Sequence, residues 1–349
     1  MIVDAASSEP AGHFGLRLDR LGGRPFLVAI AVLNAMTGTA AAAVLIPTTF
    51  GGDVDIFRRG SIGVGEGSIA PGFLYAPLFG LLATPLTWPP FEVAATVVSL
   101  AGLAVLLLGV ALETRGRATI DRALVAVAAV TFLPVVYELI TGQVTLFIAA
   151  AIYPLRDRDG WRRGIAHGVV MGLIPKPLLV PLLLWMLLYR RRASVAAVAV
   201  ALGVTIVGVA LLGPDLYRGW AAALVGTGQI TRNGNLALNA LEPPWLAGCL
   251  WLASAAAGLL IIARLEAAGF VAALVVAMLV QPFTLTYAAS ILLLAVRPAL
   301  KLMPRATRWL SLAGNPAVLA GFVPWMLAGL AACALKVWEQ GPDGPSEPA

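Results

Sequence analysis

Apolar runs of about 20 residues recur along this chain from Pro25 to Leu335, and each is long enough to cross a membrane as an α-helix. Backbone polar groups find no water in lipid, so a chain can cross only as helices or as a closed barrel. Barrel strands would be short and would alternate apolar with polar residues, which these runs do not. The sequence therefore predicts an all-α, polytopic transmembrane helical bundle with about ten to twelve membrane segments.

The composition excludes most alternatives to a membrane protein. Hydrophobic residues make up 60% of the 349 residues and charged residues 12%, whereas soluble domains carry about a quarter charged residues. Too few polar residues remain to cover a large soluble enzyme. The net charge of +6 comes mostly from arginines in short loops, which indicates membrane topology rather than nucleic-acid binding.

The residues that could hold a cofactor are scarce. Cys249 and Cys333 both lie in apolar segments, where cysteine behaves as a small hydrophobic residue, and His13 and His167 are far apart. No nucleotide-binding glycine motif, zinc motif or serine nucleophile motif is present. We expect no cofactor. A divalent metal held by acids of one polar segment stays an open alternative, although no ligand spacing requires it; these acids are Asp53, Asp55 and Glu66.

We expect one transmembrane domain over residues 25–337, between a cytoplasmic tail (1–24) and a disordered tail (338–349). If the arginine clusters face the cytoplasm, loops 47–71 and 213–244 lie outside. The segment 72–86 either spans or re-enters from the outside, and we favour re-entry because prolines interrupt it. The other predicted segments are 25–46, 91–112, 125–139, 144–155, 164–174, 178–189, 193–212, 245–263, 267–280, 288–296 and 316–335.

This topology brings the polar motifs to one outer face. Asp53 and Asp55 follow the first apolar run, and one of them is a candidate general base; the alternative is a solvated acidic loop. Arg58 and Arg59 suit a phosphate, or simply pair with the acids.

Lys176 stands between two prolines in an apolar run, where a buried ammonium is costly. We interpret it as a ligand for an anionic headgroup, with a lysine that reaches the membrane interface as the alternative. Glu138 and Gln143 flank a neighbouring turn on the same face, and both could equally be capping residues.

The loop from Gly226 to Trp245 interleaves amides with apolar residues, and Asn235 and Asn239 suit sugar hydroxyls or a diphosphate. Tyr75 and Tyr287 could stack on a sugar. The alternatives are a surface loop with turns and an interfacial aromatic belt.

Six short stretches resemble motifs of glycosyltransferase family 87, which uses polyprenol-phosphate sugars, has a GT-C-type fold and includes mannosyltransferases that extend phosphatidylinositol mannosides. They cover Gly51 to Val296 in the family's order, with departures at Ala76, Leu236, Ala237, Gln281 and Leu285. The stretches are Asp53–Phe57, Phe73–Phe79, Thr141–Val144, Ile174–Pro177, Gly234–Asn239 and Gln281–Thr284.

The resemblance implies a role for each motif. Asp53 would be the base that activates the acceptor hydroxyl, and Lys176, with Arg58 or Arg59, would hold the donor phosphate. Substrate contacts would come from the remaining polar residues of the motifs and their neighbours: Asp55, Tyr75, Gln143, Asn235, Asn239 and Tyr287. The implied reaction moves a hexose, with mannose as the expected sugar, from a polyprenyl-phosphate donor to a lipid or glycan acceptor with inversion.

We expect the protein in a bacterial inner membrane, with its site facing the periplasm and membrane lipids around it. The rival interpretation is a transporter or lipid flippase, which broken helices and a buried lysine would also suit. Against it, the sequence shows no two matched halves with paired broken helices. A non-catalytic membrane scaffold is the third interpretation.

Overall fold

The computed structural model describes residues 24–176, 179–226, 238, 241–280, 286–320 and 322–340. This part of the chain is built of helices and contains no strand, so the all-α prediction is confirmed. The α-helices are α1 (Arg24–Thr49), α2 (Gly52–Gly65), α3 (Pro77–Leu82), α4 (Phe91–Glu113), α5 (Thr119–Val130), α6 (Leu133–Thr141), α7 (Thr145–Asp157), α8 (Trp161–Leu173), α9 (Leu179–Tyr189), α10 (Arg191–Leu212), α11 (Pro214–Gly226), α12 (Pro244–Arg264), α13 (Glu266–Val280), α14 (Leu293–Leu302), α15 (Pro304–Ala320) and α16 (Phe322–Gln340). Two short 3₁₀ helices are η2 (Thr84–Thr87) and η5 (Thr286–Leu292).

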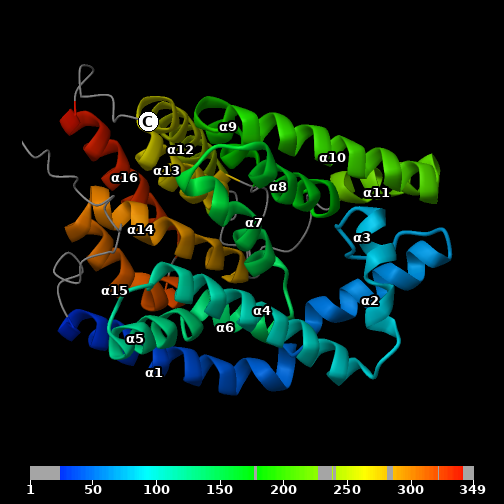
Figure 1. The fold of residues 1–349 in the computed structure, drawn as a ribbon, viewed down its shortest axis with the longest axis horizontal. Helices are drawn as coiled ribbons and strands as arrows, with labels where there is room; N and C mark the ends of the chain where they lie inside the picture. The colour runs from blue at the N-terminus through cyan, green and yellow to red at the C-terminus, as the bar shows by residue number, and fades with distance from the viewer. Residues whose placement is uncertain are drawn as a thin grey trace, which may run out of the picture.

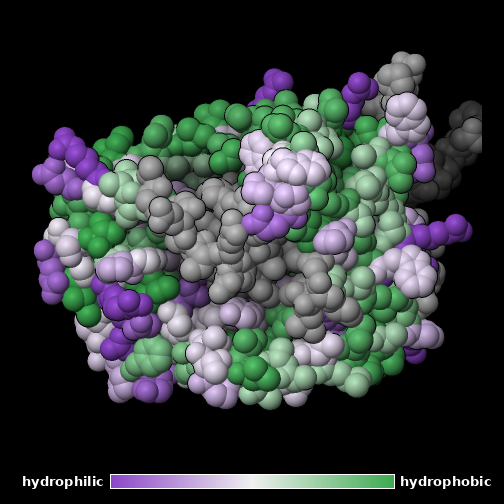
Figure 2. Space-filling model, turned by 180° about the vertical axis from the view of Figure 1, so that it is seen from behind, coloured by the Kyte–Doolittle hydropathy of each residue, from purple (hydrophilic) through white to green (hydrophobic). Residues whose placement is uncertain are grey.

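The described helices include four segments long and apolar enough to cross a membrane, or up to five if the bent pair α5–α6 counts as one. These segments are Arg24–Gly65, Phe91–Glu113, Arg191–Leu212 and Pro244–Arg264. Apolar side chains are exposed on the outward faces of these segments, such as Leu211 at 64% exposure. Hydrophobic side chains cover broad areas of the face in Figure 2. The chain is therefore a membrane-embedded helical protein, while the number of ten to twelve segments stays a prediction.

The helices form two groups joined by α7. Helices α1, α4, α5 and α6 lie along one side, and α8 to α11 lie along the other (Figure 1). Helices α12, α13 and α14 to α16 close one end, and α2 and α3 lie at the other end. The largest apolar core cluster runs through the middle, where α13 is buried along almost its whole length.

Helices α8 and α10 pack closely because three glycines recur at every fourth residue of α8. A Cβ atom at Gly164 would lie 2.0 Å from the carbonyl oxygen of Ala193, and one at Gly168 would lie 2.5 Å from that of Ala197. At Gly172 the clash would be with Val204. Small residues at this spacing let membrane helices approach closely. This pair fixes the end of α8, from which the segment carrying Lys176 departs.

Helices α5 and α6 are bent by 64° at a short break. Pro134 lies in the first turn of α6, where its missing N–H costs no helical hydrogen bond. The Asn315 side chain accepts a hydrogen bond from the backbone N–H of Leu133 at 2.8 Å and donates one to the Thr37 hydroxyl at 2.6 Å. At the bend, the backbone N–H of Leu133 therefore has a hydrogen-bond partner, which backbone groups embedded in lipid require. It directs the carboxyl end of α6 toward α2.

Three predicted features differ from the structure. The predicted outer loop 47–71 contains α2, whose glycines obscured an apolar face formed by Val54, Phe57 and Val64. The predicted loop 213–244 contains α11, and the predicted segment 316–335 is divided between α15 and α16. A fourth feature fits: in the segment 72–86 the chain forms only α3 and η2, which are 6 and 4 residues long, so no helix spans there, and the favoured re-entry stays a prediction.

Other predicted segments match the helices well. The apolar runs 193–212 and 245–263 correspond to α10 and α12, and the run 267–280 corresponds to α13. Uniform hydrophobicity over many residues identifies a buried or lipid-facing helix without any help from tertiary contacts.

Candidate active site

The first turn of α2 carries the predicted base. Gly51 has a left-handed backbone (φ 70°), and its N–H donates to the carbonyl oxygen of Ile140 at 2.8 Å, which ties the start of α2 to the end of α6. Asp53 is buried at 9% exposure. A carboxylate in a first helical turn is stabilised by the helix dipole. This local arrangement points Asp53 inward, toward the turn that follows α6.

That turn presents Gln143 as the centre of a polar cluster. Its side-chain oxygen accepts hydrogen bonds from the Tyr75 hydroxyl at 3.1 Å, the Lys176 ammonium at 3.3 Å and the backbone N–H of Val144 at 3.0 Å. The Asp53 carboxylate is close enough to interact with the side chains of Gln143 and Thr141 and with the charge of Lys176. Gln143 therefore lies beside both the acid and the lysine.

Gly142 makes this turn possible for two reasons. Its φ is +74°, a left-handed conformation that strains any other residue. A Cβ atom there would also lie 2.4 Å from Cγ2 of Val54, one residue after Asp53. The glycine between Thr141 and Gln143 thus allows the turn to rest directly on α2.

Lys176 enters the cluster from the segment between α8 and α9. Its backbone N–H donates to the carbonyl oxygen of Ile174 at 2.7 Å in a tight turn. The ammonium lies 5.8 Å from the centre of the Tyr75 ring, within the range of a cation–π interaction. It attracts the carboxylates of Asp53 and Glu138 electrostatically. An ammonium so placed is the natural partner of an anionic group.

Tyr75 is held by aromatic neighbours rather than left open. Its ring stacks on Phe79 with centres 4.8 Å apart and meets Phe57 edge-on at 5.0 Å. The backbone N–H of Ala76 donates to the carbonyl oxygen of Leu173, which docks this stretch on α8. This packing directs the Tyr75 hydroxyl toward Gln143. The Tyr75 ring itself packs against Phe57 and Phe79.

The sequence alone did not decide whether Glu138 is a site residue or a capping residue. It is buried at 1% exposure. One carboxylate oxygen accepts a hydrogen bond from the backbone N–H of Leu146, in the first turn of α7, and the other accepts one from the Ser290 hydroxyl. It therefore caps α7 and ties it to η5. Its position five residues before Gln143 was the only signal in the sequence.

The other predicted site residues lie differently. Asp55 and Arg59 are half exposed and form an i,i+4 ion pair at 2.8 Å, which is the simple pairing that the sequence left open. Arg58 donates to the carbonyl oxygen of Pro89 at 3.0 Å and lies over the Phe91 ring. Their roles toward phosphate or substrate stay predictions. Asn235, Asn239 and the side chain of Tyr287 lie outside the described residues.

No group of three or more His, Cys, Asp or Glu side chains suited to a metal occurs within the described ranges. Asp55 faces away in its ion pair with Arg59, and the carboxylate of Glu138 accepts hydrogen bonds from protein donors. The cluster thus offers an acid, an amide, an ammonium and a phenol. These groups can take up a proton, hold an anion and orient a hydroxyl.

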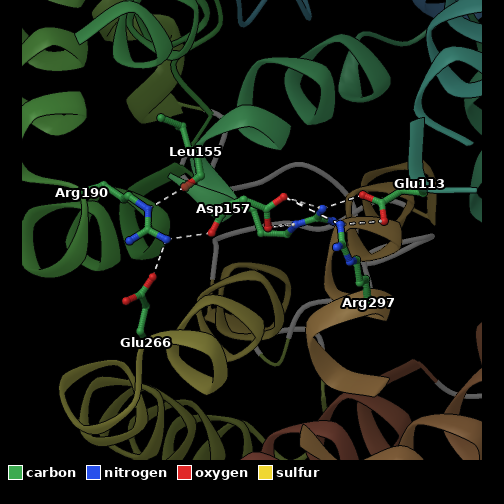
Figure 3. A network of polar contacts seen from close by, with 7 residues as sticks. Glu113, Leu155, Asp157, Arg190, Glu266 and Arg297 are labelled. Carbon is green, nitrogen blue, oxygen red and sulfur yellow. Dashed lines mark hydrogen bonds and ion pairs between the residues drawn. The ribbon is translucent and has the colours of Figure 1, made fainter. Parts of the chain in front are cut away.

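A second polar region, which we call the ion-pair network, lies at the far end of α7 (Figure 3). Arg156 contacts Glu113 at 2.6 Å and Asp157 at 3.0 Å. Arg297 lies 3.5 Å from Glu113 and 3.8 Å from Asp157. The network joins α4, α7 and α14 through opposite charges in contact.

Arg190 extends the ion-pair network to α13. It pairs with Glu266 and donates to the carbonyl oxygens of Leu155 and Arg156, each at 2.8 Å. The basic clusters that the sequence assigns to cytoplasmic loops include Arg156 and Arg190, whose side chains are buried in the structure at 5% and 8% exposure. Burial of a guanidinium is tolerated there because carboxylates and carbonyls surround it.

The family model of glycosyltransferase family 87 matches residues 73–304 of the chain. The chain belongs to glycosyltransferase family 87. The matched residues include Tyr75, Glu138, Gln143 and Lys176, whereas Asp53 precedes them. A search of curated proteins finds no match, and neither does a search of solved structures. This member of family 87 is a membrane-embedded glycosyltransferase, and its buried polar cluster is the candidate site for sugar transfer.

Proposed function

We propose that this family 87 glycosyltransferase moves a hexose, with mannose as the expected sugar, from a polyprenyl-phosphate donor to a hydroxyl of a lipid or glycan acceptor, with inversion. The observation that carries this proposal is the buried cluster of Asp53, Gln143 and Lys176. It places a proton acceptor and an anion-binding ammonium on the two sides of a single amide. Transfer from a sugar phosphate needs one group of each kind.

The proposed reaction is a single displacement. Asp53 accepts the proton of the acceptor hydroxyl, and the acceptor oxygen forms a bond to the anomeric carbon of the sugar. The bond between that carbon and the phosphate oxygen breaks, and its electron pair stays on the phosphate. The products are the glycosylated acceptor and polyprenyl phosphate, which carries the additional negative charge.

Lys176 would stabilise that departing phosphate. An ammonium next to developing negative charge lowers the barrier most when the site is dry, because little water screens the charge. The Gln143 oxygen, 3.3 Å from the Lys176 ammonium, orients it. We therefore assign Lys176 to the donor phosphate and regard Gln143 and Tyr75 as positioning residues.

The number of carboxylates favours displacement without a covalent intermediate. A retaining mechanism uses two carboxyl groups, one as nucleophile and one as acid and base. Asp53 is the acid of the cluster left for proton transfer, because both carboxylate oxygens of Glu138 already accept hydrogen bonds, from the Leu146 N–H and the Ser290 hydroxyl. With one available base, inversion is the expected outcome.

We also propose that the cluster faces the outside of a bacterial inner membrane. The positions of basic clusters in the sequence support this orientation. A sugar on a lipid phosphate can be supplied there, since nucleotide sugars stay in the cytoplasm. The partners are then a lipid-linked donor, a lipid or glycan acceptor and the surrounding lipids.

The proposal is tested by transfer of radiolabelled mannose from polyprenyl-phosphate mannose, with purified protein in liposomes and a membrane lipid extract as acceptor. We expect a new glycosidic bond of inverted configuration, and no product when a nucleotide sugar replaces the lipid-linked donor. Movement of the labelled lipid across the bilayer without any new glycosidic bond would instead indicate a transporter and would refute the proposal.

A further inference from the structure

A large apolar cavity extends between Ser290, which donates to Glu138, and the ion-pair network. Its volume is about 550 Å³, within the range of about 300–1,000 Å³ typical of small-ligand pockets. Side chains of α1, α4, α5, α7 and α14 to α16 line it, and neither Asp53 nor Lys176 is among them. Leu108 lines the cavity and is also 62% exposed, so the cavity reaches the outer, apolar surface of the bundle.

The cavity has one strongly polar end. Arg117, Arg156, Arg297 and Glu113 line it, and the rest of the wall is mainly Leu, Val, Ala and Phe. Arg117 lies in the connection between α4 and α5, where burial lowers the pKa of its guanidinium and Arg297 contributes in the same direction, while Asp121 and Glu113 oppose both effects. Three guanidiniums and one carboxylate line this end of the cavity, so its positive charge is in excess and favours an added anion.

This polar end is remote from the candidate active site. Glu113 ends α4, whereas Phe91 begins it and lies against Gly51 and Arg58 at the start of α2. The 23 residues of α4 extend about 34 Å. An anion bound at Arg117 therefore cannot be the phosphate that leaves beside Lys176.

We propose that the cavity binds one acyl chain of an anionic phospholipid, with the headgroup phosphate at Arg117 and Arg297. The apolar wall matches a hydrocarbon chain, the opening toward the apolar surface gives the chain a path from the bilayer, and the two guanidiniums match the phosphate. The chain would end near Ser290, which lines the cavity and donates to Glu138. The inference does not depend on the transfer reaction.

Native mass spectrometry of the purified full-length protein tests this site, with phosphatidylglycerol, phosphatidylcholine and polyprenyl phosphate as separate probes. We expect wild-type protein to retain one phosphatidylglycerol in at least tenfold preference over phosphatidylcholine. Arg117→Gln should remove that preference. The exposed Arg218, 78% exposed in its ion pair, provides the matched control Arg218→Gln, which should retain it.

A second variant fills the cavity without removing any charge. Gly109 lines the cavity, and a Cβ atom there meets no heavy atom within 4 Å, so Gly109→Leu should fold and displace the lipid. Gly203 of α10 has equally open space and lies outside the lining, so Gly203→Leu is the matched control. Equal retention by Gly109→Leu and wild type, or by phosphatidylcholine and phosphatidylglycerol, would overturn the proposal. Displacement of polyprenyl phosphate, rather than phospholipid, by Gly109→Leu would overturn it as well.

Discussion

The two ends of α7 hold charged groups in opposite ways. At its carboxyl end, the ion-pair network brings three arginines into contact with three carboxylates, at N–O distances that include 2.6 and 3.0 Å. At its amino end, the cluster of Asp53, Gln143 and Lys176 connects its charges through a neutral amide. Directly paired charges join helices, whereas charges spaced by an amide can exchange partners with a substrate. The comparison predicts that damage to the first end affects stability and that damage to the second affects turnover.

The largest effect should follow removal of the base. Asp53→Asn keeps the shape of the side chain but cannot accept the proton, so transfer should fall about 10²- to 10⁴-fold while the melting temperature is maintained. Rates of labelled mannose transfer measure this. Asp215→Asn, at an exposed carboxylate of α11, is the matched control and should keep full activity. If Asp55→Asn rather than Asp53→Asn abolishes transfer, the base has been assigned to the wrong acid.

The ion-pair network should respond in the opposite way. Arg156→Met leaves Glu113 and Asp157 without their closest cation, and breaking a buried pair costs about 3–5 kcal/mol of stability. Thermal unfolding in detergent measures the loss, and transfer per folded molecule should stay near wild type. Arg218→Met breaks an exposed pair and should cost less than about 1 kcal/mol. A stable Arg156→Met protein with low turnover would reverse the comparison.

Removal of Lys176, the proposed phosphate ligand, should cause the next largest loss of transfer activity. Lys176→Met removes the ammonium, and removal of one group that stabilises developing charge typically lowers kcat about 10²- to 10³-fold. Single-turnover transfer with saturating donor separates this effect from binding. Lys336→Met, at an exposed lysine paired with Glu339, is the matched control. If Lys176→Met changes only the affinity for the donor and leaves the rate of transfer unchanged, Lys176 does not stabilise the departing phosphate.

Gly142→Ala should lower both stability and turnover. A left-handed backbone costs a non-glycine residue about 1–3 kcal/mol, and the new methyl group would press on Val54. The double variant Gly142→Ala with Val54→Ala removes the contact and leaves the strain. We expect it to recover part of the stability in thermal unfolding. No recovery would show that backbone strain alone makes Gly142 necessary.

The smallest effect should come from Tyr75→Phe. It removes one hydrogen bond to Gln143, which is worth about 0.5–1.5 kcal/mol, and retains the aromatic packing. Turnover should fall by a factor of a few, measured as kcat at saturating donor. A loss as large as that of Lys176→Met would give Tyr75 a direct part in the reaction.

Much of the helical framework follows from hydropathy alone. Helices α10, α12 and α13 lie where long apolar runs predict them. Helix α2 could not be predicted in this way, because its glycines allow the close approach of Phe73, and this reason is visible only in three dimensions. Hydropathy also does not show that the run 316–335 is divided between α15 and α16, although Gly321 and Pro324 in that run are residues that interrupt helices.

The candidate site was only partly predictable. Placing the polar motifs on one face led to Asp53, Gln143 and Lys176, which the structure brings together. The sequence could not separate Glu138 from an ordinary cap, because its partner Ser290 is 152 residues away. It also could not show that arginines of short loops lie buried in ion pairs, since pairing between distant loops depends on the fold.

A structure of the protein in a lipid bilayer with bound polyprenyl phosphate tests the central claim most directly. The account predicts the phosphate in contact with the Lys176 ammonium, at about 2.7–2.9 Å, with Asp53 facing the same space. A phosphate bound instead at Arg117 and Arg297, with Lys176 still held only by protein groups, would contradict it.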